Sequence, residues 1–317
     1  MPQIPVGVGG AVITGWGTAL PPKRVTNDDL AQYLDTTDEW IVDRTGIRER
    51  HVGGTTAGLS IDSGRAALDM AGIEAGDIDA LVLATTTPDR TVPATSATVQ
   101  AALGTRGGAF DVNAACSGFV YGLVVAHGLI SLGSRRVLMI GTDTLARITD
   151  WDDRNTAILF GDGSGAVVLE AVDGPGQLLG WDLDTDGTAE RLLFAEIGGN
   201  MQMDGKEVFR RAVRIMVDSA QKSMAHAGVT PDDLALIVPH QANIRIIEAA
   251  CKRLGVPMEK AATVLHRTGN TSSASIPLAL ADALESGRVS DGDLVLLVGF
   301  GAGMTAASAI LRWGGGL

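Results

Sequence analysis

The sequence predicts an α/β protein made of two similar halves. Stretches with helical periodicity alternate along the chain with short apolar runs that are typical of buried strands. Three segments of the first half also recur, in the same order, in the second half. The composition agrees with such a fold, because 45% of the 317 residues are hydrophobic and only 20% are charged, so that a large core can form.

Hydrophobic periodicity places the individual elements. Apolar residues at helical spacing predict helices over residues 60–72, 116–132, 206–227 and 272–285. Short apolar runs predict strands over residues 80–86, 109–112, 136–141, 166–169, 234–238, 294–298 and 306–311. Continuous apolar strands between helices are typical of sheets whose faces are covered by helices. We therefore expect mostly buried sheets in both halves.

The recurring segments indicate an internal duplication. The matched pairs are residues 71–83 with 227–238, 100–104 with 251–255, and 137–141 with 295–299. Their offsets are all roughly 150–160 positions, as two copies of one unit require. We predict an N-terminal half over residues 1–173 and a C-terminal half over residues 174–317, joined near Gly174-Pro175-Gly176.

Charge, cysteine content and hydropathy exclude several classes of protein. The net charge of −12 argues against non-specific binding of nucleic acid. Cys116 and Cys251 are too few for a disulfide framework, which favours a reducing compartment. Residues 1–17 lack the basic region and cleavage site of a signal peptide, and no run of about 18 apolar residues predicts a membrane span. We expect a cytoplasmic protein without a membrane partner.

Three polar residues lie at related junctions of the two halves. His240 directly follows the strand at 234–238. Cys116 follows the strand at 109–112 and opens a helix, and Asn270 precedes the corresponding helix of the second half. Ligands of α/β folds gather at the carboxyl ends of strands. A pseudo-twofold arrangement of the halves is therefore expected to bring the three side chains together.

Cys116 is a candidate nucleophile. Small residues precede it in Asn113-Ala114-Ala115-Cys116, and an apolar helix follows. At a helix N-terminus the macrodipole lowers the pKa of a thiol and favours the thiolate. A buried structural cysteine is the alternative, and local context leaves both interpretations open. Cys251 lies inside a helical pattern over residues 241–254, where the structural interpretation is favoured.

His240 and Asn270 gain interest mainly in combination with Cys116. A histidine at a strand end before a helix is a better functional candidate than one inside a helix, and His266 is the only rival. By itself, Asn270 is typical of a turn or helix cap. Its amide donates hydrogen bonds but exchanges no proton at neutral pH, which suits the stabilisation of an oxyanion or enolate.

Two glycine-rich segments, residues 161–165 and 299–303, each lead into a strand. No helix follows the second, so it is no dinucleotide-binding fingerprint. Both are interpreted as tight turns, and the second is placed to present a backbone N–H to an oxyanion. No metal-ligand spacing is present in the sequence.

Six motifs carry a resemblance that runs nearly from end to end of the chain. They are Thr37-Asp38-Glu39-Trp40-Ile41, Arg44-Thr45-Gly46-Ile47-Arg48, Ala114-Ala115-Cys116-Ser117-Gly118-Phe119, Phe160-Gly161-Asp162-Gly163, Val238-Pro239-His240-Gln241-Ala242-Asn243 and Gly269-Asn270-Thr271-Ser272. In these motifs the chain resembles the β-ketoacyl-acyl-carrier-protein synthase III family, the initiating condensing enzymes of type II fatty-acid synthesis. The resemblance implies the duplicated thiolase-like fold, layered α-β-α-β-α, which agrees with the repeats.

The resemblance also implies the chemistry. Cys116 would attack an acyl-CoA, and decarboxylation of malonyl-acyl-carrier protein would give an enolate held by neutral His240 and by Asn270. The backbone N–H groups of Cys116 and Ala302 would form the oxyanion hole. The carbanion would then attack the acyl-Cys116 and yield a β-ketoacyl product. The enzyme would need no cofactor and would act as a homodimer.

Further residues receive roles from the resemblance alone. Implied for CoA binding are Thr36, Trp40, Arg44, Arg154 and Asn243. Implied for the acyl pocket are Val92, Phe160 and Phe300, with Val92 reaching the partner subunit's pocket. Because several relatives have Phe there, Val92 predicts a primer larger than acetyl. A basic patch for an acidic carrier protein is predicted from Arg210, Arg211, Arg214, Arg245, Lys252 and Arg253, with ordinary helix-surface charge as the alternative.

Three other functions compete with this interpretation. A priming ketosynthase or acyltransferase of polyketide biosynthesis would have the same fold and the same catalytic residues. A papain-like cysteine hydrolase also uses Cys, His and Asn, but its local cysteine signature is absent here. A non-catalytic scaffold would need none of Cys116, His240 and Asn270. The sequence therefore favours decarboxylative condensation through an acyl-cysteine.

Overall fold

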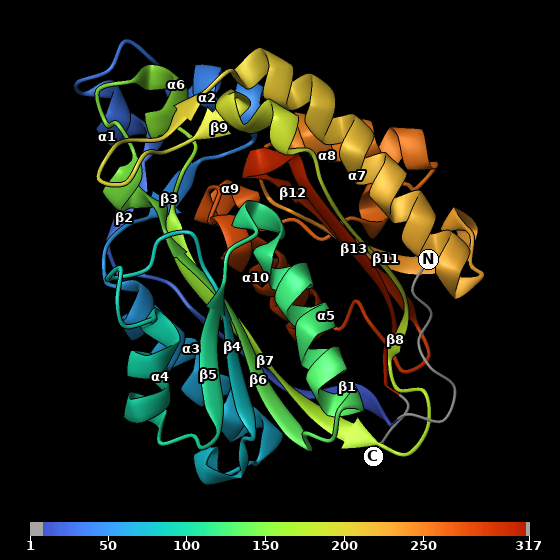
Figure 1. Ribbon diagram of the computed structural model, residues 1–317. Helices are drawn as coiled ribbons and strands as arrows, with labels where there is room; N and C mark the ends of the chain where they lie inside the picture. The colour runs from blue at the N-terminus through green and yellow to red at the C-terminus, as the bar shows by residue number, and fades with distance from the viewer. Residues whose placement is uncertain (1–8, 315–317) are drawn as a thin grey trace.

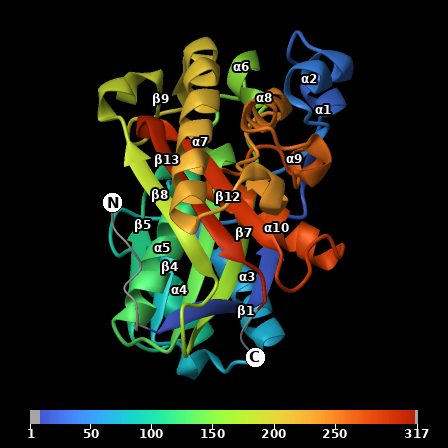
Figure 2. The same ribbon diagram turned by 90° about the vertical axis from the view of Figure 1, so that its right-hand side faces the viewer.

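A computed structural model describes residues 9–314 of the chain. It contains two mixed β-sheets that lie face to face with helices between and outside them (Figures 1 and 2). The five layers agree with the predicted α-β-α-β-α arrangement. No helix within the described residues is both long and apolar enough to cross a membrane.

The first sheet has the strand order β1-β7-β6-β4-β5. Its strands are β1 (Gly10–Ala19), β4 (Ala80–Ala84), β5 (Gly108–Val112), β6 (Arg136–Thr144) and β7 (Asp162–Val172). β4 pairs in parallel with β5 and with β6, whereas β7 is antiparallel to β6 and to β1. The carboxyl ends of β4, β5 and β6 therefore meet at one edge of the sheet.

The second sheet repeats this plan with the order β11-β12-β13-β8. Its strands are β8 (Leu178–Thr185), β11 (Leu234–Pro239), β12 (Leu294–Gly301) and β13 (Thr305–Arg312). β11 and β12 are parallel, and β13 is antiparallel to both of its neighbours. The first sheet ends at Val172 and the second begins at Leu178, while the boundary at 173/174 stays a prediction.

Helices α5 (Gly118–Ser131) and α10 (Ser275–Glu285) fill the space between the sheets, as Figure 1 shows. They share one apolar core with the inner faces of both sheets. The outer helices are α3 (Thr56–Ala71) and α4 (Thr95–Leu103) on the first sheet, and α7 (Gly205–Ala227) and α8 (Ile244–Leu254) on the second. Alternate residues of β4 show why both faces are apolar, because Leu81 and Leu83 pack outward and Val82 packs inward.

Shorter elements complete the chain. They are β2 (Arg24–Thr26), α1 (Asn27–Ala31), α2 (Asp38–Thr45), β3 (Glu49–His51), α6 (Arg154–Ala157), β9 (Leu193–Phe194), β10 (Gln202–Met203) and α9 (Leu265–Thr268). Single 3₁₀ turns are η1 (Ala75–Asp77), η2 (Ala115–Ser117), η3 (Leu145–Ile148), η5 (Pro231–Asp233), η6 (Met258–Lys260), η7 (Ser272–Ala274) and η8 (Ala302–Met304), and η4 (Gly187–Leu192) is longer.

The predicted strands all exist, but two strands of the large sheets, β1 and β8, and the short strands β2, β3, β9 and β10 were not predicted. β1 carries three glycines and β8 alternates apolar with acidic residues, so neither gives a continuous apolar run. The helices predicted from residues 116 and 272 begin later, at Gly118 and Ser275. The signal-peptide expectation concerns residues 1–17, of which 1–8 lie outside the described residues.

Candidate active site

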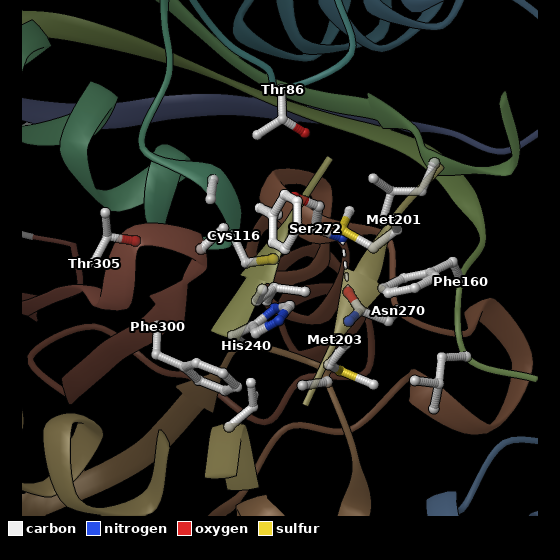
Figure 3. A pocket seen from close by; sticks show the side chains of 18 of the residues that line it. Thr86, Cys116, Phe160, Met201, Met203, His240, Asn270, Ser272, Phe300 and Thr305 are labelled. Atoms are coloured by element: carbon white, nitrogen blue, oxygen red, sulfur yellow. Dashed lines mark hydrogen bonds between the residues drawn. The ribbon is translucent and has the colours of Figure 1, made fainter. Parts of the chain in front are cut away.

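A cavity of about 420 Å³ lies where the two halves meet, and its wall contains Cys116, His240 and Asn270. Figure 3 shows the thiol, the imidazole and the amide pointing toward a common space. Cys116 comes from η2, His240 follows β11 and Asn270 precedes η7. The structure thus brings together the three residues that the sequence singled out. The rival His266 lies on α9 and is not part of the cavity wall.

The turn that carries Cys116 is held in an uncommon conformation. The preceding residue, Ala115, has φ 48°, a left-handed value that L-residues other than Asn and Asp rarely adopt. The Thr305 hydroxyl donates to the carbonyl of Ala114 (3.0 Å) and anchors the turn to β13. Gly301 approaches so closely that a Cβ there would lie 2.6 Å from the backbone N of Cys116. The surrounding structure therefore fixes the strained turn.

The expected activation of Cys116 by a helix N-terminus is wrong for the free protein. Burial raises the pKa of the thiol to about 12, Ser272 lowers it in part, and the charge of Asp143 raises it further. A fraction of Cys116 is open to the cavity, but α5 begins only at Gly118. Loss of hydration is the largest of these effects and disfavours the charged thiolate. Cys116 is a protonated thiol at neutral pH.

His240 is held as a neutral imidazole. Burial lowers its pKa to about 3. Its backbone N–H donates to Val298 on β12 (2.8 Å), and the Phe300 ring packs edge-on at 5.4 Å between ring centroids. The ring Nδ1 lies 2.6 Å from the hydroxyl oxygen of Ser275. This agrees with the expected neutral state.

Asn270 directs its amide NH₂ group toward the cavity because its oxygen is already occupied. The backbone N–H of Ser272 donates to Oδ1 at 2.9 Å (Figure 3). The backbone of Asn270 forms a β-bridge with Phe160 and accepts from the N–H of Gly161. The interpretation of Asn270 as a turn residue is therefore also correct. Its side-chain oxygen stabilises the turn, and the two N–H donors of its amide remain available to a ligand in the cavity.

The proposed second oxyanion donor, Ala302, lies in the cavity wall at the start of η8. Gly303 (φ 70°) and Met304 (φ 46°) are both left-handed, which turns the chain sharply between β12 and β13. The expected tight turn is therefore confined to η8, because residues 299–301 are the last residues of β12. The expectation of a tight turn at residues 161–165 is wrong, because residues 162–165 are the first residues of β7.

The residues implied for CoA binding gather beside the cavity. The guanidinium groups of Arg44 and Arg154 lie over the Trp40 ring, at 4.3 and 4.7 Å from its centroid. Asn243 lines the cavity and donates to the carbonyl of Arg44 at 2.9 Å, which joins α8 to α2. The Thr36 hydroxyl is buried without a hydrogen-bond partner among the described residues. Trp40, Arg44, Arg154 and Asn243 therefore form one contacting group, the Trp40 group, whose role stays a prediction.

Of the residues expected in the acyl pocket, Phe160 and Phe300 line the cavity and Val92 does not. Val92 is 79% exposed in the loop after β4, where it is free to contact another molecule. The sequence analysis missed Met201 and Met203, which project into the same cavity from the β9–β10 hairpin. Their spacing of two residues is the only available signal, because two-residue strands leave no periodic pattern.

The predicted basic patch is partly neutralised by neighbouring acids. Arg210 and Arg211 both pair with Glu207, and Arg245 pairs with Asp43. Arg214, Lys252 and Arg253 form no ion pair with other described residues. Cys251 lies buried in α8, as the structural interpretation expects.

Asp143 is a buried acid beside the site that the sequence analysis did not single out. It is the second-last residue of β6, and its carboxylate accepts hydrogen bonds from hydroxyl and N–H groups of Thr85, Thr86, Thr87 and Ser273. The carboxylate therefore ties the loop after β4 to η7. An acidic residue two positions after the apolar run Val137–Gly141 was the available signal.

Comparisons with known proteins agree with this geometry. Residues 110–187 match the family model 3-Oxoacyl-[acyl-carrier-protein (ACP)] synthase III, and residues 224–313 match its C-terminal model. The chain is 50% identical to the beta-ketoacyl-[acyl-carrier-protein] synthase III of Roseiflexus sp. (strain RS-1), over 96% of this chain and 98% of that protein.

Two solved structures extend the comparison. The 3-oxoacyl-[acyl-carrier-protein] synthase III from Aquifex aeolicus VF5 has a TM-score of 0.94 and 41% identity, over 96% of this chain and 100% of that chain. The priming beta-ketosynthase from the R1128 polyketide biosynthetic pathway has a TM-score of 0.92 and 36% identity, over 100% and 99% of the two chains.

Fold and relatives together define an acyl-transferring condensing enzyme with the thiolase fold. Its reaction is the initiating condensation of fatty-acid synthesis. The chain belongs to the 3-oxoacyl-[acyl-carrier-protein] synthase III family.

Proposed function

We propose that the chain condenses an acyl-CoA primer with malonyl-acyl-carrier protein through an acyl-Cys116 intermediate. The observation that carries the proposal is the meeting of Cys116, His240 and Asn270 in one cavity of a synthase III chain. In the first step the Cys116 sulfur attacks the thioester carbonyl. The acyl group moves to the cysteine, and the thiol proton leaves with CoA. The backbone N–H groups of Cys116 and Ala302 hold the intermediate oxyanion.

In the second step malonyl-acyl-carrier protein loses its carboxylate as CO₂. The electron pair of the broken C–C bond delocalises onto the thioester oxygen, where His240 and Asn270 donate hydrogen bonds to the enolate. The resulting carbanion attacks the acyl-Cys116 carbonyl, forms the new C–C bond and expels the cysteine thiolate. A proton from solvent restores the thiol. All of these steps use groups of the chain and its substrates, and none needs a cofactor.

The Trp40 group is proposed to bind CoA. Trp40 and Arg154 would hold the adenine between an aromatic ring and a planar cation, and Thr36 and Arg44 would contact the base and phosphates. Because Arg154 lies over the ring in the free protein, adenine would have to displace it. Asn243, in the cavity wall, would contact the pantetheine arm.

A homodimer formed through β5 is proposed. β5 is an edge strand of the first sheet, and Phe110 on it is 36% exposed. A second copy pairing along this edge would bring its Val92 toward the cavity of the first. Sedimentation of the wild type and of Phe110→Lys tests the arrangement, with a dimer and a monomer as the expected results.

Carrier-protein docking is proposed for the basic residues of α7 and α8. Arg214, Lys252 and Arg253 are the strongest members, since Glu207 and Asp43 already neutralise the others. Charge reversal at Arg253 is expected to raise KM for the malonyl-carrier substrate and to leave acylation by acyl-CoA unchanged. We also propose the division into halves at 173/174 and a cytoplasmic location.

The acylation assay tests the central proposal. The protein is incubated with acetyl-, isobutyryl- and octanoyl-CoA, and the mass of the intact chain is measured. We expect a mass increase by one acyl group in the wild type and none in Cys116→Ala. An acylated Cys116→Ala variant would contradict the mechanism, and strict preference for acetyl-CoA would contradict the larger primer inferred from Val92.

A priming role in polyketide biosynthesis is the second candidate, favoured by the 36% identity to a priming ketosynthase. The two roles share their chemistry and differ in the carrier protein that accepts the product. Condensation with malonyl-loaded carriers of both pathways distinguishes them. Faster turnover with the fatty-acid carrier is the expected result.

A further inference from the structure

The imidazole of His240 has a buried hydroxyl as its nearest support. Ser275, the first residue of α10, is 0% exposed, and its Oγ lies 2.6 Å from Nδ1 of His240. We infer that Ser275 is a positioning residue that holds His240 as the tautomer with its proton on Nε2, facing the cavity. The consequence for catalysis rests on the function proposed above, whereas the tautomer itself does not.

Counting protons assigns the direction of the Ser275–His240 hydrogen bond. The backbone N–H of Gln241 donates to Ser275 Oγ at 3.3 Å, so the oxygen already accepts one hydrogen bond. Among the described residues, no acceptor other than His240 Nδ1 lies within reach of the hydroxyl proton. A buried hydroxyl whose proton finds no acceptor is costly. The hydroxyl therefore donates to Nδ1, and the ring proton resides on Nε2.

The opposite tautomer would leave two groups unsatisfied. With the proton on Nδ1, the ring would donate to Ser275 and the serine proton would have no partner in a fully buried place. The bare Nε2 would then present a lone pair to the cavity, where the enolate oxygen also carries lone pairs. When the Ser275 hydroxyl points its proton at Nδ1, both the serine proton and the Nδ1 lone pair are satisfied, and Nε2–H faces the cavity.

The Gln241 side chain fixes the backbone next to His240. Its side-chain NH₂ donates to the carbonyls of Pro239 and Ala262, and its oxygen accepts from the N–H groups of Val264 and Leu265. All four hydrogen-bonding positions of this buried amide are thus occupied. The backbone on either side of His240 has little freedom, so the Nδ1–Oγ contact is preorganised.

The two half-reactions should depend differently on Ser275. The enolate formed by decarboxylation needs the Nε2–H donor, whereas the acylation oxyanion is assigned to backbone N–H groups of Cys116 and Ala302. Loss of the serine hydroxyl therefore weakens decarboxylation about tenfold, the fold-change that one ordinary hydrogen bond is worth. Acylation of Cys116 changes less than about threefold.

Nitrogen NMR of the ¹⁵N-histidine-labelled wild type tests the tautomer directly. Histidine ring nitrogens with and without a proton differ widely in chemical shift, and His240→Gln identifies the signal of His240 among the five histidines. We expect a protonated Nε2 and a bare Nδ1 at neutral pH. A proton on Nδ1 overturns the inference, whether or not the protein condenses anything. A correct tautomer without condensation would instead contradict the proposed function alone.

Three variants separate positioning from mere stability. Ser275→Ala should lower decarboxylation of malonyl-carrier about tenfold with acylation retained, and Ser275→Thr, which keeps a hydroxyl, should restore most of the rate. Ser308→Ala is the matched control, because Ser308 is equally buried and loses its hydrogen bonds to Ser219 on α7. Equal losses in both half-reactions for Ser275→Ala, or no rescue by Thr in a folded protein, overturn the assignment.

Discussion

Replacing Gly301 by alanine tests the oxyanion hole at its tightest point. Gly301 has extended backbone (φ −158°, ψ −176°), so an alanine suffers no conformational penalty there. Its Cβ, however, would lie 2.6 Å from the backbone N of Cys116 and 2.8 Å from Cβ of Ala115. Contacts below 3.0 Å with backbone force the Cys116 turn to move, since the turn has no flexible side chain that can yield.

The magnitude follows from what the displaced N–H does. If that group holds the acylation oxyanion, its loss lowers the acylation rate about 10²–10³-fold, or roughly 3–4 kcal/mol of transition-state stabilisation. Overpacking also lowers the free energy of unfolding by about 1–3 kcal/mol. The rate is measured as the mass increase of the chain after rapid mixing with acyl-CoA, at a temperature where both proteins are folded.

Two controls make the result specific. The Cβ of Gly299→Ala, on the same strand, would meet the tip of Ile276 at 3.3 Å and the backbone of Cys116 and Ser117 at 3.5 Å. These are ordinary or nearly ordinary contacts, so acylation should change less than about threefold. Alkylation of Cys116 by iodoacetamide develops no oxyanion and should therefore be far less affected by Gly301→Ala. A folded Gly301→Ala protein that acylates within threefold of the wild type refutes the placement of the Cys116 N–H in the hole.

Other consequences of the structure are testable in the same assays. Asn270→Asp keeps the oxygen that accepts from Ser272 but loses the NH₂ donor, so decarboxylation should fall about 10²–10³-fold while acylation persists; equal losses would contradict the role. Trp40→Ala should raise KM for acyl-CoA about tenfold with kcat nearly unchanged, as steady-state kinetics would show. Burial lowers the pKa of His127 to about 4, so the unfolded chain binds its proton first as the pH falls below 6.5. The free energy of unfolding should therefore decrease between pH 6.5 and pH 4, by on the order of 2–3 kcal/mol from this residue. Denaturant titrations should show a shallower decrease in His127→Gln, and an identical decrease would contradict the assignment.

Regular patterns carried most of the fold prediction. Apolar runs placed the central strands of both sheets, because a strand buried on both faces cannot be polar. β1 and β8 were not predicted, because pairing with β7 and β13 stabilises them as strands although their sequences have no continuous apolar run. Gly15 and Gly17 of β1 pack so closely on α3 that a Cβ at either position would meet helix backbone within about 2.4 Å. Such close contact is a tertiary property that one sequence does not display.

The residues that meet in the candidate site could be predicted from the sequence, but the protonation state of Cys116 could not. Position relative to strand and helix ends made Cys116, His240 and Asn270 candidates, and the resemblance in six motifs was needed to favour their catalytic interpretation. The state of Cys116 was predicted wrongly because the sequence displays the helix that follows the cysteine and hides the segments that bury its thiol. Ser272 and Asp143, which both shift the pKa of Cys116, are more than 25 residues away along the chain. Ser275 was not predicted to support His240, because the two residues are 35 positions apart in the sequence and meet only in the folded protein.

The duplication gives the proposed nucleophile Cys116 a structural counterpart in the second half. Ser272 (φ 50°) repeats the left-handed conformation of Ala115 (φ 48°), and each is followed by a turn that leads into a central helix. Ser273 therefore stands in the second half where Cys116 stands in the first. Its hydroxyl is fully buried and donates to Asp143 (2.7 Å), and its oxygen lies 3.0 Å from the carbonyl oxygen of Ala84.

The side chains at the equivalent positions, Cys116 and Ser273, therefore make different contacts. In the first half the turn leaves the Cys116 side chain at the cavity, where a substrate can reach it. In the second half the side chain at the equivalent position, Ser273, donates its hydrogen bond to Asp143 instead. The N–H of Ser272 orients Asn270 toward the same cavity. The same strained turn occurs in both halves: in the first it carries the proposed nucleophile, and in the second it orients the amide proposed to bind the enolate. The chemistry therefore requires both halves, although each half folds around the same plan.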